Sequence, residues 1–291
     1  MKQALNKIAP YLYVVPALLL VGGFLLAPML YTLRLSFTEY DLMMPPKFIG
    51  LANYRNLLTE PNFLTSVTNT FIWMIGTLLL PVGLGLFIAV IVNRIVFADL
   101  FKSVFYIPLT ISAVATGLIW TWMYGPDLGV VNSMLRGVGL SGWARSWLTE
   151  VPANTISMIV AWTWKMTGQN MIIFLVGLQA IPQEPVEAAK LEGATGWQTF
   201  RYVVFPLMRA MTMVVITMSL INSLNQFDLI YVMTQGGPYR SSETLAMTMY
   251  RESFTMFHMG YGASVAIVLS LIVILLSGSY LRANLRQERN Q

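Results

Sequence analysis

The chain has 291 residues, of which 56% are hydrophobic and only 11% are charged, and its net charge is +5. Soluble globular chains carry about 25% charged residues, so this composition indicates a membrane protein and argues against a soluble domain. The chain has no cysteine and one histidine, which argues against a disulfide framework, a thiolate metal site and a histidine-based triad.

Six apolar stretches are long enough to cross a bilayer, whose core requires about 20 residues of helix. In chain order they lie near 10–33, 66–93, 103–124, 155–180, 210–233 and 259–281. The first is too long for a typical signal peptide and no small-residue cleavage site follows it, so we expect it to remain in the membrane. The sequence therefore predicts an all-α membrane protein with six transmembrane helices, forming one transmembrane domain over residues 1–291.

Lysine and arginine are unevenly distributed between the segments that connect these spans. If both termini are cytoplasmic, the inside segments hold ten Lys and Arg in 57 residues, and the outside segments hold seven in 88. Cytoplasmic segments are enriched in these residues, so we predict a multi-pass protein of the inner membrane with both termini in the cytoplasm. The basic residues form no continuous run, and no nucleic acid partner is predicted.

The connection between the fourth and fifth spans, residues 182–206, is unusually polar and is predicted to face the cytoplasm. Prolines begin a short helix there, and Gly193 is placed to end it in the left-handed conformation. Thr195 and Gln198 have the spacing of a capping box, which predicts a second short helix. Connections in helical bundles usually have about 2–8 residues, so a docking element is favoured over a connector that merely lies on lipid headgroups.

Charged and polar residues also interrupt the fourth and fifth spans. A charge at the centre of a bilayer costs about 2.5–3.5 kcal/mol, so such residues usually face the interior of the helix bundle. We expect an interior role for Lys165, which includes pairing with Asp228 or with helix-end carbonyls. Asp228 lies toward the outer end of its span, where solvation is an equally good interpretation.

Aromatic rings and amides suit the binding of a sugar, although for any single residue interfacial anchoring or a hydrogen bond between helices is an alternative. As a cluster, these residues favour a translocation path. The predicted path comprises Trp162, Trp164, Lys165, Gln169, Asn170, Asn222, Asn225, Gln226 and Asp228.

Motifs for catalysis are absent from the sequence. It contains no G-x-x-x-x-G-K-[ST] phosphate loop, so we expect this chain to bind no ATP and to depend on another polypeptide for energy. G-x-S-x-G and H-E-x-x-H are absent as well, so no catalytic residue, metal ligand or cofactor is predicted and the chain is not expected to be an enzyme.

The stretch EAAKLEGATGWQTFRYVVFP, residues 187–206, resembles the EAA signature of ABC importer permeases. Val203 and Phe205 stand where that family usually has isoleucine and leucine, which is a mild departure. The resemblance implies that element 182–206 is a coupling helix region that fits a groove of a cytoplasmic ATPase. The residues that match the signature, and to which it assigns ATPase coupling, are Glu187, Ala188, Ala189, Gly193 and Pro206.

A second stretch, NQFDLIYVMTQGGPYRSSETLA at 225–246, resembles the carbohydrate permeases of the maltose and lactose type that bear a GGP motif. Residues 162–182 and 48–58 match the same family in register. The resemblance implies a permease for a sugar or oligosaccharide that forms a heterodimer with a second permease subunit. It also implies two cytoplasmic ATPase subunits that bind ATP and Mg, an extracytoplasmic solute-binding protein, and membrane lipid around the spans.

Other functions remain open at this point. The same class of importer also serves glycerol phosphate, polyols and other sugar derivatives. An ion-coupled secondary transporter is a more distant alternative, since no inverted repeat is apparent and the 182–206 element would be unexplained. A purely structural membrane scaffold is more distant still.

Overall fold

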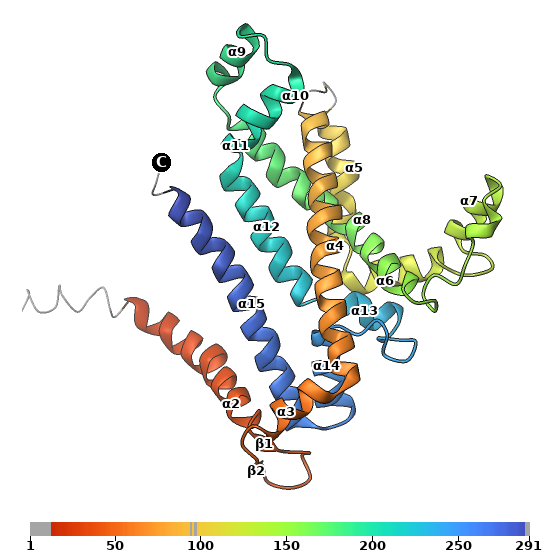
Figure 1. Ribbon diagram of the computed structural model, residues 1–291, viewed down its shortest axis with the longest axis vertical. Helices are drawn as coiled ribbons and strands as arrows, with labels where there is room; N and C mark the ends of the chain where they lie inside the picture. Colours follow the sequence, from red (N-terminus) through yellow and green to blue (C-terminus); the bar gives the residue numbers. More distant parts are fainter. Residues whose placement is uncertain (1–12, 94, 96–97, 289–291) are drawn as a thin grey trace, which may run out of the picture. The chain divides into compact units, whose positions relative to one another are not determined.

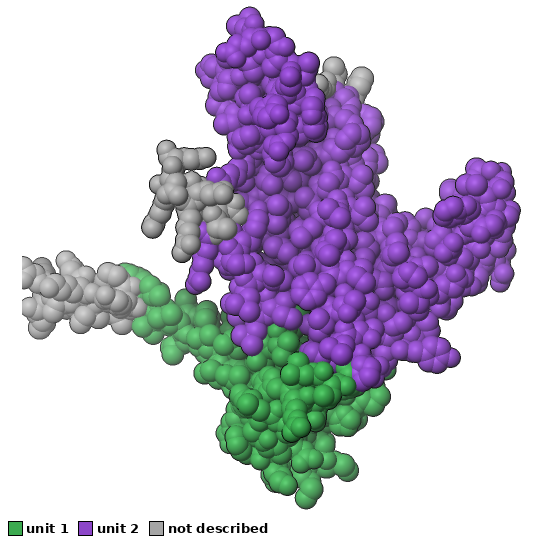
Figure 2. Space-filling model, viewed as in Figure 1, with its two compact units in different colours: residues 1–60, 248–270 green, residues 61–247, 271–291 purple. Residues whose placement is uncertain are grey.

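The protein is mainly helical, and its computed structural model describes residues 13–93, 95 and 98–288 (Figure 1). The chain divides into two compact units, shown in different colours in Figure 2. Unit 1 comprises residues 1–60 and 248–270, and unit 2 comprises residues 61–247 and 271–291. Both units are therefore discontinuous in sequence.

Unit 1 contains a long apolar helix and a short β-hairpin. Tyr13–Leu35 is long and apolar enough to cross a membrane, and residues 10–12 of the predicted first span lie outside the described residues. After the helix, the buried amide of Asn53 donates to the carbonyls of Ser36 and Thr38, each at 2.9 Å, and so fixes the turn that precedes the hairpin. The elements are π-helical Gly22–Leu26, α2 (Ala27–Leu35), antiparallel β1 (Thr38–Glu39) and β2 (Lys47–Phe48), α3 (Ala52–Thr59), and π-helical Arg251–Thr255.

Unit 2 is a bundle of longer helices with a small lobe at each end. The bundle helices are α4 (Pro61–Val92), α5 (Ala98–Thr110), α6 (Ala113–Met123), α8 (Ala153–Gln179) and α12 (Arg209–Leu224). The shorter elements are α7 (Val130–Gly137), a 3-10 turn (Ser141–Trp143), α9 (Gln183–Leu191), α10 (Gly196–Thr199), a π-helical turn (Phe200–Val204), α11 (Phe205–Leu207) and α13 (Asp228–Met233). Two helices join the units in sequence, α14 (Leu245–Tyr250) and α15 (Met259–Glu288).

The 27-residue helix α8 is the centre of unit 2 (Figure 1). It packs against α4, α5 and α12, and most of its side chains are buried. One apolar cluster surrounds its first half and includes Met158, Trp73 of α4 and Leu229 of α13. A second cluster surrounds its last half and includes Phe174 and Val215 of α12. Lys165 and Asn170 are buried, so the surrounding protein shields these two polar side chains of α8 from lipid.

Among the described residues, three helices are long and apolar enough to cross a membrane on their own. They are Tyr13–Leu35, Pro61–Val92 and Met259–Tyr280, and the number rises to five if two bent helix pairs are each counted as one span. The α8 helix, predicted as the fourth span, is not among them, because Lys165, Gln169 and Asn170 interrupt its apolar sequence. The chain is thus a multi-pass helical membrane protein.

Two predicted spans are not single helices, which corrects the sequence analysis. The span expected at 103–124 is divided into α5 and α6, which are bent by 99° at Ile111 and Ser112. Ser112 begins α6 as its N-cap, accepting a hydrogen bond from the Ala115 amide at 3.1 Å. The span expected at 210–233 is interrupted at residues 225–227, between α12 and α13. Apolar composition indicates burial in lipid or protein, but it does not reveal these local breaks.

The ends of two other spans differ from the prediction. The second begins at Pro61 and not at 66, and in its first turns the hydroxyls of Thr65 and Ser66 donate to carbonyls of the preceding turn. The last helix continues past 281 to Glu288.

Candidate functional site

The segment predicted to dock folds as two short helices joined at a glycine. Helix α9 ends before Gly193, whose φ of +85° is the left-handed conformation that glycine adopts without strain. Thr195 and Gln198 form the predicted capping box. The backbone N–H of Gln198 donates to the Thr195 hydroxyl at 3.3 Å, and the backbone N–H of Thr195 donates to the side-chain oxygen of Gln198 at 2.7 Å. The local structure predicted for this segment is therefore confirmed.

The element is anchored to the core of unit 2 by two valines. Val186 of α9 and Val204 of the π-helical turn pack against the apolar cluster that includes Phe174 of α8 and Val215 of α12. A row of rings reinforces the second helix, since Trp197 and Phe200 have centroids 5.9 Å apart. The two valines thus connect the element to α8 and α12 through packed side chains.

The opposite face of the element is exposed and partly apolar. Glu187 and Ala188 are exposed, Ala189 is half-buried, and Pro206 lies exposed in the first turn of α11. Leu191 is 90% exposed and Trp197 is 70% exposed, beside the charged side chains of α9. Large exposed apolar groups rimmed by charges are typical of a protein interaction surface.

A cavity of about 520 Å³ lies between this element and the ends of α4 and α8. Leu178 contributes to its wall from the end of α8, Ile181 from the residues that follow α8, and Val90 from α4. Lys190 and Thr199 add polar groups from the element itself. Val186 and Val204, which anchor the element, line the same cavity.

The polar and aromatic residues predicted in the fourth span lie in different environments along α8. Trp162 is half-buried against the first apolar cluster, and the partly exposed Trp164 makes an edge contact with Trp120 of α6 at 6.0 Å. Gln169 is half-buried and Asn170 is buried. The buried Asn170 packs closely against Gly85 of α4, because a Cβ placed on that glycine would be 2.6 Å from the Asn170 Cβ.

Lys165 contacts helix-end carbonyls, which is one of the two structural alternatives considered for it. Its ammonium donates to the carbonyl of Leu109 at 3.3 Å and to that of Ile111, where α5 ends. Asp228 lies elsewhere, exposed in the first turn of α13.

The polar residues predicted in the fifth span gather at the break between α12 and α13. Asn222 is half-buried, Asn225 is exposed and Gln226 is 4% exposed. The Asn225 amide donates to the Ile221 carbonyl at 3.1 Å, and the Gln226 carbonyl accepts a hydrogen bond from the Thr244 hydroxyl at 2.9 Å. Phe227 packs on the same apolar cluster as Trp162, so the break and the first half of α8 are neighbours.

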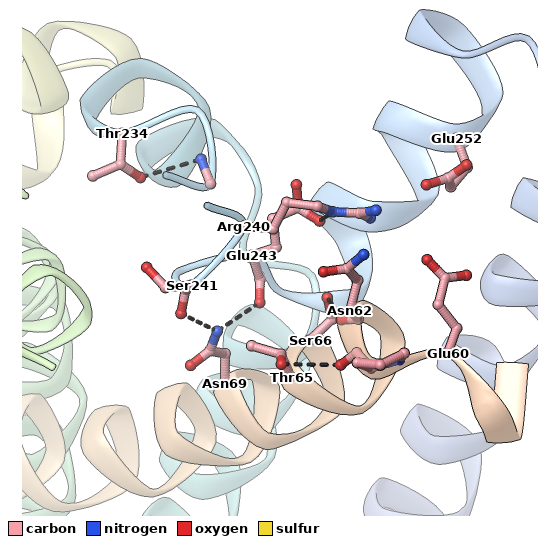
Figure 3. A network of polar contacts seen from close by, with 12 residues as sticks. Glu60, Asn62, Thr65, Ser66, Asn69, Thr234, Arg240, Ser241, Glu243 and Glu252 are labelled. Carbon is pink, nitrogen blue, oxygen red and sulfur yellow. Dashed lines mark hydrogen bonds and ion pairs between the residues drawn. The ribbon is translucent and has the colours of Figure 1, made fainter. Parts of the chain in front are cut away.

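The loop that carries the GGP motif is held by residues that the sequence analysis did not single out. Asn69 of α4 donates to the carbonyls of Ser241 and Glu243 at 2.7 and 2.9 Å (Figure 3). Asn154 of α8 donates to the Gly237 carbonyl at 3.2 Å. Asparagines within or at the start of apolar helices were the available signal, because buried amides in such helices need partners.

Arg240 and Glu243 stabilise the same loop from within. Their side chains form an ion pair at 2.9 Å, and the Glu243 carboxylate is fully buried (Figure 3). Gly236, at a φ of +83°, lies against this carboxylate, and a Cβ there would be 2.4 Å from the Glu243 Cγ. At the loop's apex Tyr239 is fully exposed. A loop with an exposed ring is thus hydrogen-bonded to α4 and α8.

Comparisons with known proteins agree with this architecture. Residues 81–290 match the family described as binding-protein-dependent transport system inner membrane component. The chain is 35% identical over 280 residues to a probable ABC transporter permease protein of Pyrococcus horikoshii, and the match covers 94% of each protein.

Relatives with named cargoes are also similar along nearly the whole chain. The lactose transport system permease of Rhizobium radiobacter is 33% identical, covering 92% of this chain and 91% of that protein. The sn-glycerol-3-phosphate transport system permease of Agrobacterium fabrum is 30% identical, covering 95% and 94%. The fold is similar to a chain in the crystal structure of a bacterial ABC transporter that imports the acidic polysaccharide alginate, with a TM-score of 0.85, 21% identity and 98% coverage of both chains.

Proposed function

Because the chain belongs to the family of binding-protein-dependent transport system inner membrane components, we propose that it is the permease subunit of an ABC importer for a sugar or oligosaccharide. The observation that carries this proposal is the capped element of residues 182–206, exposed on one side and anchored to α8 and α12 on the other. A transport chain that lacks its own phosphate loop needs such a surface, so that a separate ATPase can bind to it and displace it.

In the proposed mechanism, the ATPase contacts the exposed face of α9 and α10. Ala188 and Ala189 leave a low profile that permits close approach, and Leu191 and Trp197 supply apolar anchors. ATP and Mg bind to two copies of that cytoplasmic subunit, and this chain binds neither. When the ATPase moves, the packed valines Val186 and Val204 transmit the displacement to α8 and α12.

The moving helices carry the proposed substrate path. Amides and ring faces at the α12–α13 break and on α8 suit the hydroxyl groups and C–H faces of a sugar. The proposed path residues are Trp162, Trp164, Gln169, Asn170, Asn222, Asn225, Gln226 and Asp228, with Lys165 considered separately below.

We further propose six membrane crossings, by Tyr13–Leu35, α4, α5 with α6, α8, α12 with α13, and α15. Both termini and the 182–206 element then face the cytoplasm, in agreement with the distribution of lysine and arginine. The GGP loop faces outward, where a solute-binding protein delivers cargo. A second, different permease subunit completes the path as a heterodimer.

Two kinds of cargo deserve comparison. A relative that imports lactose supports a neutral carbohydrate, and a relative that imports sn-glycerol-3-phosphate keeps a phosphorylated alcohol as the second candidate. Measuring which compounds stimulate ATP hydrolysis by the assembled transporter separates these two.

Replacing Gly193 tests the coupling role. Gly193→Leu forces a side chain into the left-handed region, which costs about 1–2 kcal/mol and distorts the turn between α9 and α10. We expect the variant to insert in the membrane but to lose sugar uptake and co-purification with the ATPase. Glu187→Lys, which reverses a charge on the exposed face, should have the same effect without strain in the backbone.

The matched control is Gly139→Leu. Gly139 has a φ of +81° and, like Gly193, has no atom within 4 Å of a built Cβ, so the strain is equal but lies outside the element. It should retain both uptake and ATPase assembly. Equal effects of the two glycine substitutions, or normal uptake by Gly193→Leu and Glu187→Lys, would contradict the coupling proposal.

A further inference from the structure

We propose that Lys165 is a positioning residue, whose ammonium ends α5 and holds the bend between α5 and α6 against α8, and that it does not serve as a cation for the substrate. The bend is a feature of unit 2 alone, so the proposal does not depend on the identity of the cargo. It assigns a task to the one charged residue in the middle of α8.

The contacts of Lys165 are those of a residue that caps the C-terminal end of a helix. Its side chain is buried, with 7% exposure, and its ammonium donates to the carbonyls of Leu109 and Ile111. These carbonyls lie at the C-terminus of α5, where the last turn of a helix has no intrahelical donors and carries partial negative charge. In an apolar environment without water, a cation that satisfies two such groups stabilises the end of the helix at that point.

Gly168 brings the lysine within reach of these carbonyls. It lies three residues after Lys165, and residues at this spacing share one face of a helix. A Cβ at Gly168 would be only 1.9 Å from the carbonyl oxygen of Phe105, so the backbones of α5 and α8 touch there. One face of α8 therefore contains both Gly168, where α8 lies closest to α5, and Lys165, whose ammonium binds the last carbonyls of α5.

The start of α6 is completed independently. Ser112 accepts from the Ala115 amide through its hydroxyl, and its carbonyl accepts from the Thr116 hydroxyl at 2.9 Å. With Lys165 on one side and Ser112 on the other, the polar groups at the corner have defined partners. At the 99° bend, the start of α6 is therefore capped by its own residues, whereas the end of α5 depends on Lys165 of α8.

This assignment has a consequence for the cargo, which rests on the proposed function. Lys165 is the only lysine or arginine in α8, and α13 contains none. With its ammonium bound to carbonyls, the path residues that α8 and α13 contribute are neutral, apart from the acidic Asp228. This chain therefore provides no cation there for a phosphate or carboxylate group, and its path suits an uncharged carbohydrate.

The test measures the corner directly by electron spin resonance. Because the chain has no cysteine, spin labels can be attached at two introduced cysteines, Val104→Cys on α5 and Trp122→Cys on α6, both exposed positions. Pulsed distance measurements on the assembled transporter in lipid nanodiscs should give one narrow distribution. Lys165→Met, which keeps the length of the side chain but removes its donors, should broaden the distribution or add a second distance.

Lys102→Met is the control, because Lys102 is a lysine of α5 whose ion pair with Asp99 is on the surface. It should leave the distance unchanged, and Lys165→Arg, which keeps a donor, should restore a narrower distribution than Lys165→Met. An unchanged distance in Lys165→Met would overturn the proposal. If that variant fails to insert, Lys165→Leu, which also lacks donors, replaces it, and an unchanged distance in Lys165→Leu would overturn the proposal equally.

Uptake kinetics separate positioning from substrate binding. A positioning role predicts that Lys165→Met lowers maximal uptake by a similar factor for a neutral sugar and for glycerol phosphate. A selective rise in apparent KM for the phosphate, about tenfold or more, would show that Lys165 meets the anion and would overturn the proposal. The spin-label distances need no cargo, so failure of the wild-type transporter to move any sugar would contradict the proposed function alone.

Discussion

At the scale of single residues, the break between α12 and α13 places two amides in contrasting positions. Asn225 is exposed and uses one N–H on the Ile221 carbonyl, so its amide keeps capacity for a sugar hydroxyl. Gln226 is buried, and its backbone is fixed by Thr244. Of the two, Asn225 has the side chain that a substrate can reach from solvent.

Replacing Asn225 by alanine is therefore the sharper test of the substrate path. One lost hydrogen bond is worth about 0.5–1.5 kcal/mol, so Asn225→Ala should weaken apparent affinity for the sugar by about twofold to tenfold. Uptake of radiolabelled sugar measures this, and assembly with the ATPase should be unaffected. Asn56→Ala, at an exposed asparagine of α3, serves as the control and should transport normally. Unaltered affinity in Asn225→Ala would remove this residue from the path.

At the scale of elements, the close approach of α5 and α8 depends on a missing side chain. Gly168→Leu would force the two backbones apart, because a Cβ there meets the Phe105 carbonyl at 1.9 Å. Forcing extra volume into a packed site costs about 1–3 kcal/mol, and more where backbone must move. We expect a lower midpoint of thermal unfolding for the purified protein in detergent, together with reduced uptake.

The control for this substitution is Gly83→Leu in α4. Gly83 is also inside a helix, but no atom lies within 4 Å of a Cβ built there. The unfolding midpoint of Gly83→Leu should equal that of the wild type or exceed it, since leucine favours helix more than glycine does. Similar losses in the two variants would mean that any added side chain in these helices, and not the α5–α8 contact in particular, determines the effect.

At the scale of the whole molecule, the proposed orientation puts the 182–206 element and the GGP loop on opposite sides of the membrane. Within unit 2, α9–α11 lie at one end of α4 and α13 lies toward the other (Figure 1). The exposed positions Ser141, Gln198 and Tyr239 are suitable for single cysteines, because the chain has none of its own. Ser242, in the same loop as Tyr239, is fully buried, so a cysteine there would react poorly with a labelling reagent.

Labelling of intact cells with a membrane-impermeant maleimide tests this orientation. Ser141→Cys and Tyr239→Cys should react, whereas Gln198→Cys should react only after the membrane is opened. A cysteine at Asn290, near the terminus that we also expect inside, lies outside the described residues. Reaction of Gln198→Cys in intact cells would place the element outside and would remove the basis for contact with a cytoplasmic ATPase.

The sequence by itself determined the features that depend on neighbouring residues. Apolar stretches of sufficient length indicated a multi-pass helical membrane protein, and the EAA and GGP stretches indicated the family that the comparisons confirm. The turn at Gly193 and the capping box of Thr195 and Gln198 were predictable, because the groups that satisfy one another are at most a few residues apart. The roles of the coupling and path residues remain predictions.

Only the tertiary structure decided the breaks and the polar contacts that hold them. Lys165 meets the Leu109 carbonyl across 56 residues of sequence, and Asn69 meets the Ser241 carbonyl across 172. No local pattern shows that α5 ends at the bend, because the donor that satisfies its last carbonyls belongs to another helix. A buried polar group in an apolar chain must find a partner, but the sequence states only that need, and packing decides which partner it is.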